Sequence, residues 1–80
     1  MNRRALHAAL RARGVADGHY FIEGVHEPRP LPPDFLYVRR APHAPGVWEA
    51  GAYERGVWEA VTHRSDEAEA CADLLRLLTG

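Results

Sequence analysis

Hydrophobic positions recur at helical spacing in two segments, one near each end of the chain. In residues 3–13, Leu6 and Leu10 lie four positions apart and give a narrow apolar stripe. Asn2 is a suitable N-cap residue and Gly14 a suitable helix stop, so the pattern predicts a helix between them. We expect this helix to pack its apolar stripe against a core.

The second helical pattern covers residues 66–78. Its apolar side is made of Ala68, Cys71, Ala72, Leu75 and Leu78. Ser65 or Asp66 is the predicted N-cap, and with Asp66 in that role Glu69 completes a capping-box-like pair. Acidic residues in the first turn and Arg76 near the end match the helix dipole, which supports a helix here.

Between these segments the pattern changes to short runs of aromatic and β-branched residues, which are typical of strands. The four predicted strands are residues 19–24, 34–40, 47–53 and 57–63. Residues 25–33 contain four prolines and are expected to form an extended surface connection. This order predicts a single α+β domain over residues 1–80, with a four-stranded antiparallel sheet and both helices on one face.

The pentapeptide Gly-Val-Trp-Glu-Ala occurs twice, starting at Gly46 and at Gly56. Two adjacent strands of a hairpin need the same alternation, so we interpret the repeat as structural. A three-residue loop ending at Gly56 would place Trp48 and Trp58 among alanines on the helix-covered face. A two-residue loop of Arg55 and Gly56 would place the tryptophans on opposite faces. We favour the three-residue loop because it separates polar from apolar residues better.

With that loop, the other face of the hairpin is of mixed polarity. It carries Val47, Glu49, Gly51, Tyr53, Val57, Glu59, Val61 and His63. In the neighbouring strands, Phe21 and either the pair Phe35/Tyr37 or the pair Leu36/Val38 also point outward. This face is expected to lack a helical cover, and a large exposed apolar patch usually marks an interaction surface.

Composition narrows the functional classes. The chain is 46% hydrophobic and 26% charged with a net charge of −1, which favours neither nucleic acid nor an acidic membrane as a partner. The single cysteine excludes an intramolecular disulfide and suits the reducing cytoplasm. No segment has the ~20 apolar residues of a membrane span. Arginines at positions 3, 4, 11 and 13 give the first helix a basic side, so a small nucleic-acid-binding protein stays an alternative.

No motif for catalysis or metal binding is evident. The five histidines are not paired at ligand spacing, so neither a metal nor a cofactor is expected. Cys71 lies on the apolar stripe and is expected to pack as a small hydrophobe, and Ser65 is explained as a cap. Glu49 and Glu59 are expected near one another, where they could attract a basic partner. The chain is therefore predicted not to be an enzyme.

The segment from Trp48 to Cys71 resembles small immunity-type α+β domains of high-GC bacteria. The matching residues are Trp48, Tyr53, Glu54, Arg55, Gly56, Glu69, Ala70 and Cys71. Some domains of this type are associated with secreted toxin domains, including NAD glycohydrolases of the TNT type. The resemblance implies a non-enzymatic, cytoplasmic protein that binds a partner such as a toxin domain.

These observations favour a protein-binding module whose exposed sheet face, or its edge, covers a partner. Aromatic and arginine side chains dominate the energetics of many interfaces. The predicted partner-binding residues are Tyr37, Arg39, Glu49, Tyr53, Arg55 and Glu59. A homodimer with a structural or regulatory role, formed through the same face, is the alternative.

Overall fold

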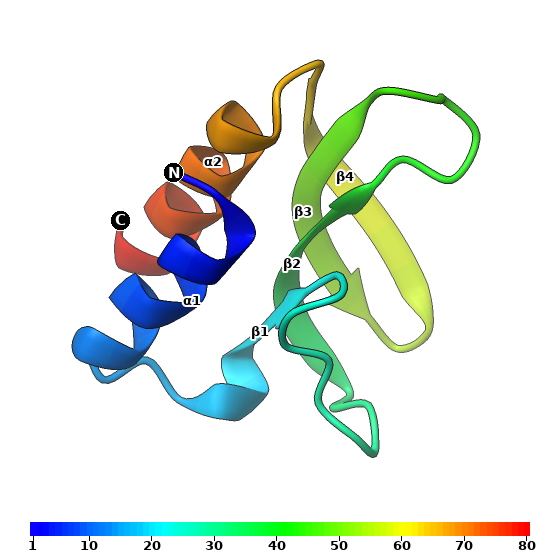
Figure 1. Ribbon diagram of the computed structural model, residues 1–80. Coiled ribbons are helices and arrows are strands. Elements are labelled where there is room, and N and C mark those ends of the chain that lie inside the picture. Colours follow the sequence, from blue (N-terminus) through cyan, green and yellow to red (C-terminus); the bar gives the residue numbers. More distant parts are fainter.

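The computed structural model describes residues 1–80 and contains two α-helices, one 3-10 helix and four strands. The elements are α1 (Arg3–Ala12), η1 (Asp17–His19), β1 (Tyr20–Ile22), β2 (Asp34–Arg40), β3 (Trp48–Glu54), β4 (Val57–Arg64) and α2 (Glu67–Thr79). The α+β class is confirmed. Figure 1 shows α1 and α2 packed against each other on one side of the sheet. We call the side of the sheet away from the helices the open face.

Both α-helices begin at residues that the sequence predicts as caps. Asn2 Oδ1 accepts a hydrogen bond from the Ala5 N–H at 2.8 Å, and Asp66 Oδ1 accepts one from the Ala68 N–H at 3.0 Å. Glu69 does not complete a capping box and instead forms a loose ion pair with strand β4. Each bond satisfies a donor that the first turn of a helix leaves free, so the helix starts are encoded locally.

The main core fills the space between the helices and the sheet. Its fully buried members are Leu6, Leu10, Tyr20, Ile22, Val38, Ala70, Cys71 and Leu74. The buried side of α2 is therefore rotated from the predicted stripe, in which Ala68 and Ala72 are only half-buried. The reason is that α2 contacts α1 as well as the sheet, so the buried part of its surface is set by two neighbours.

The prediction of an entirely antiparallel sheet is wrong. The strand order is β1-β2-β3-β4, and β1 is parallel to β2 while the other neighbours are antiparallel. The chain reverses directly after β1 through Gly24, whose φ is 74°, and His26 exchanges two backbone hydrogen bonds of 2.8 Å with Ile22. The proline-rich segment consequently runs back along β1, and β2 starts at the same end of the sheet as β1.

The loop of the β3–β4 hairpin has two residues, not the three that we favoured. Arg55 and Gly56 have φ values of 50° and 88°, as in a type I′ turn, and Glu54 pairs directly with Val57. The Arg55 N–H donates to the Pro33 carbonyl at 2.9 Å, which holds this non-glycine residue in a left-handed conformation. The two tryptophans therefore lie on opposite faces, and the prediction that both are covered by helices is wrong.

A β-bulge in β4 explains why the polarity argument failed. Ala50 pairs with Thr62 and Gly51 pairs with Ala60, so Val61 is an extra residue in the ladder. The bulge exchanges the faces of β4: Thr62 bonds to α2 on the helix side, whereas Ala60 lies on the open face. Our choice of loop assumed unbroken alternation along this strand, which the bulge interrupts.

Asp73 of α2 ties the helix to the end of β4. Its buried carboxylate accepts hydrogen bonds from Thr62 Oγ1 at 2.7 Å and Arg64 Nε at 2.8 Å, and it also pairs with Arg76. The hydrogen bonds from Arg64 lower the pKa of Asp73, and their effect, with that of Thr62 and Arg76, outweighs the opposing effect of burial. The ionised carboxylate is thus the form that the fold stabilises.

This arrangement predicts a loss of stability in acid. Because the pKa of Asp73 is lower in the folded chain, its contribution is present above the unfolded value of about 4 and disappears as pH falls through the folded value. We expect the Asp73→Asn variant to unfold at lower urea concentration than the wild type at neutral pH. The difference in unfolding urea concentration between the two proteins should shrink progressively below about pH 4. A difference that stays constant down to the acid limit would contradict this assignment.

Candidate functional site

The open face carries a second, smaller core made of aromatic rings. Phe21, Phe35 and Tyr37 are its buried members, and Tyr53 and Trp58 pack against them. The Trp58 ring meets the other four edge-on, with centroids 4.8–5.6 Å apart. In a flat sheet, β1 and β4 would be ~14 Å apart. The centroids of Phe21 in β1 and Trp58 in β4 are only 5.3 Å apart, so the sheet curls over its open face.

Beside these rings, the Glu49 carboxylate joins β2, β3 and β4. Glu49 is only 5% exposed, and its Oε2 accepts hydrogen bonds from Tyr37 Oη at 2.9 Å and Arg39 Nε at 2.8 Å. Its Oε1 lies 3.6 Å from His63 Nε2. Burial, followed by the hydrogen bond to Glu49, raises the pKa of Tyr37, so its hydroxyl stays protonated and keeps donating to the carboxylate.

Arg39 is held in one orientation by three contacts. Its guanidinium carbon lies 4.2 Å from the centre of the Trp58 ring and 5.4 Å from that of Tyr37, while Nε is bonded to Glu49. The two terminal nitrogens of Arg39 donate no hydrogen bond within the protein. A guanidinium fixed in this way offers a forked pair of donors with little further loss of side-chain entropy.

These groups border a cavity of about 320 Å³ between β4 and the loop that joins β2 to β3. Arg39, Glu49, Trp58, Ala60, His63 and the loop residue His43 are among its lining residues. His63 is well exposed and Glu49 is nearly sealed beneath it. Arginine and imidazole N–H groups next to an indole can bind acceptor oxygens of a partner, such as main-chain carbonyls or carboxylates.

The structure brings four of the six predicted partner-binding residues together on the open face: Tyr37, Arg39, Glu49 and Tyr53. Arg55 lies at the exposed tip of the hairpin. Glu59 pairs with Ala52 on the other face, so the expectation that Glu59 is a neighbour of Glu49 is wrong. The two-residue loop by itself places these matching residues of the repeat on opposite sides.

Two residues of this site were not among the predicted set. Trp58 was assigned to the helix side, although the alternative two-residue loop would have placed it on the open face. His63 is predicted on the open face but not among the binding residues, and it lies against Glu49. For Trp58 the signal was the turn type, because hairpin register decides which residues share a face, whereas the open-face position of His63 in the structure depends on the bulge.

The remaining candidates have structural explanations. Cys71 is fully buried in the main core, and burial raises the pKa of its thiol to about 11, so it packs as a small apolar side chain. The pair Phe35/Tyr37, rather than Leu36/Val38, faces outward. No three His, Cys, Asp or Glu side chains are grouped closely enough to hold a metal ion.

Neither helix is long and apolar enough to cross a membrane. Comparison with known proteins gives no family model, no curated protein and no solved structure that matches this chain.

Proposed function

We propose that this chain is a small, non-enzymatic protein-binding module that covers a partner with the open face of its sheet. The observation that supports this best is the trio of Arg39, Trp58 and Tyr53. Trp58 and Tyr53 are partly exposed on this face, and Arg39 is stacked on the indole at 4.2 Å. Tryptophan, tyrosine and arginine are the residues most enriched at interface hot spots.

The trio is rigid before any partner arrives. The Trp58 ring is enclosed by four aromatic neighbours, and Arg39 is bonded to the buried Glu49. Ordering a flexible side chain at an interface costs about 0.5–1.5 kcal/mol. Anchors that are already ordered avoid most of this cost, so a small surface can bind tightly.

The edge of the sheet extends this surface. β4 has no neighbour on its outer side, and Val57 and Val61 in it are 59% and 62% exposed. An unpaired edge with exposed valines offers both main-chain hydrogen bonds and apolar contact to a partner. The open face and this edge are continuous along β4.

In this proposal the module acts by steric cover, in the way that an immunity-type protein blocks a toxin domain. The partner is a toxin domain, and binding takes place in the cytoplasm, where the unpaired Cys71 stays reduced. None of its own groups performs a reaction. Glu49 holds Arg39 in place, and Arg39 and His63 present donors to the partner.

Affinity capture from cells that encode this chain tests the proposal. We expect the wild type to retain a protein that both Val61→Asp and Trp58→Phe bind at least ~10-fold more weakly. The first change puts a charge on the apolar edge, and the second removes part of the central indole. Leu77→Asp is the matched control, because Leu77 is an exposed apolar residue on α2, away from the open face. Its binding should equal that of the wild type.

The mass of the free protein in solution tests the alternative, in which a second copy of the chain covers the open face. A wild-type dimer that Val61→Asp converts to a monomer would show that a second copy covers the open face, as in the homodimer hypothesis. If neither open-face variant weakens capture while Leu77→Asp does, the partner binds the helical side and the proposal fails.

A further inference from the structure

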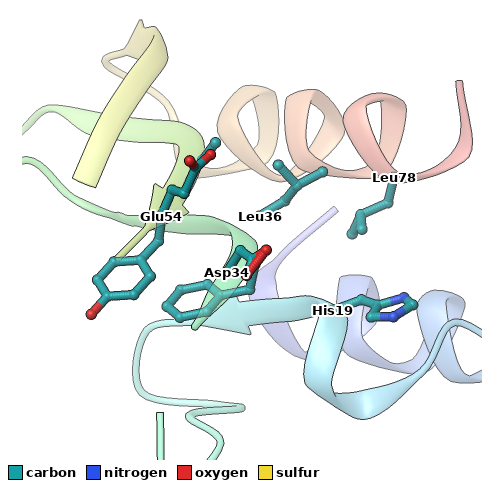
Figure 2. A pocket seen from close by; sticks show the side chains of 8 residues that line it. His19, Asp34, Leu36, Glu54 and Leu78 are labelled. Carbon is teal, nitrogen blue, oxygen red and sulfur yellow. The ribbon is translucent and has the colours of Figure 1, made fainter. Parts of the chain in front are cut away.

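A groove of about 380 Å³ lies at the end of the sheet opposite the Glu49 cluster. It is formed by the start of β2, the end of β3, η1 and the last turn of α2. Figure 2 shows Asp34, Leu36, Leu78 and His19 arranged around this hollow, with Glu54 at its rim. The groove is thus apolar in its interior and acidic at its edge.

The carboxylates at this edge have no cationic partner. Asp34 and Glu54 are directly opposite each other in the β2–β3 ladder, and neither forms a hydrogen bond or an ion pair through its side chain. Glu59 pairs with Ala52, which lines the groove, and its carboxylate is also free. Arg55, in the adjoining turn, reaches none of them. Like charges facing each other across strands destabilise a sheet, so this arrangement weakens the free protein.

A ligand with an aliphatic chain and a cationic end would satisfy both parts of the groove. The methylene groups of a lysine or arginine side chain pack well on apolar surface while the charged end stays at the rim. Here Leu36, Ala52 and Leu78 provide the apolar surface, and Asp34 and Glu54 provide the counter-charge. An anionic ligand would be repelled by the same carboxylates.

We infer that this groove binds a lysine or arginine side chain of the partner protein. The inference rests on the proposed function only for the origin of that side chain. Tyr53 lines the groove and also stacks on Phe35 in the aromatic cluster, with ring centroids 4.5 Å apart. Leu36, Ala52 and Leu78 lie on the helix side, so a partner on the open face reaches the groove around the end of the sheet, where Tyr53 lines it.

A small-molecule probe tests the groove without any partner. We expect butylguanidinium, added to isotope-labelled protein, to cause saturable NMR shifts at Leu36, Ala52 and Leu78, with a dissociation constant of about 1 mM. The neutral butylurea and the anionic pentanoate should leave these signals unchanged. The double variant Asp34→Asn/Glu54→Gln should bind the cation at least ~10-fold more weakly. This variant should fold well, because it removes a repulsion.

The control is Glu27→Gln/Glu69→Gln, which changes the net charge by the same amount outside the groove. Its affinity for butylguanidinium should match that of the wild type. Equal binding of butylurea, or an equal loss in the control, would overturn the inference. The partner gives a separate result: if Asp34→Asn/Glu54→Gln captures it as tightly as the wild type, the groove is not used, while the proposed function of the open face stands.

Discussion

Replacement of Glu49 by alanine is expected to lower the free energy of unfolding by about 3 kcal/mol. The carboxylate is 5% exposed and accepts hydrogen bonds from both Tyr37 and Arg39. Alanine would leave an arginine and a tyrosine hydroxyl with unmet hydrogen bonds in a largely buried place, which is far more costly than losing an exposed charge. An 80-residue domain has a total stability of only about 4–12 kcal/mol, so this loss is large.

Urea unfolding of the two matching repeat variants measures the effect. Glu59→Ala is the internal control, because Glu59 holds the same position in the second pentapeptide but is exposed and unpaired. We expect its stability to stay within about 0.5 kcal/mol of the wild type. Similar effects of the two substitutions would show that the two copies of the repeat do not have opposite environments.

Replacement of Gly51 by alanine is expected to be at least as disruptive. A Cβ atom at Gly51 would overlap the carbonyl oxygen of Glu59 and lie 2.8 Å from the Cα of Ala60. Both are main-chain atoms of the neighbouring strand, so no side chain can move aside. We expect a loss of about 3 kcal/mol or more, because β4 would have to shift at its bulge.

Gly18→Ala is the appropriate comparison for this variant. A Cβ atom at Gly18 meets nothing within 4 Å, and its backbone does not require glycine. We expect Gly18→Ala to be neutral or to stabilise the fold by up to about 1 kcal/mol, because alanine lowers the conformational entropy of the unfolded chain. Thermal unfolding of both variants gives the comparison, and a Gly51→Ala protein as stable as Gly18→Ala would show that the strands are not packed this closely.

Local signals in the sequence were sufficient to predict the helices and strands themselves. Asn2 and Asp66 cap the helices that their positions predict, and β2 spans the predicted residues 34–40. These features depend on a few neighbouring residues, whose preferences are readable without the rest of the chain.

The relations between strands were harder to predict, because small backbone features change them. Reversal at Gly24 makes β1 parallel to β2, and the extra residue Val61 changes the facing of half of β4. Each of these two backbone features moves several side chains to another face or another neighbour, while the alternation of apolar and polar residues in the sequence stays the same. The candidate site was predicted only in part for the same reason. The facing of Arg39 and Glu49 does not depend on the length of the hairpin loop, whereas that of Trp58 and Glu59 does.

The curl of the sheet was not predictable from the pattern. Aromatic residues of β1, β2 and β3 were expected to form a bare patch, and they instead enclose Trp58 of β4. The exposed part of the open face is consequently smaller than a flat sheet would offer, and more ordered. It contains the edges of Trp58 and Tyr53, the Arg39 guanidinium and His63.

Fluorine NMR of protein labelled with fluorotryptophan tests the central claim most directly, since each copy of the repeat contributes one indole. Trp48 lies on the helix side between Arg3 and Arg40, and Trp58 lies on the open face. On addition of the captured partner, we expect the Trp58 signal to shift and the Trp48 signal to stay in place. A shift of the Trp48 signal with no change at Trp58 would contradict the account.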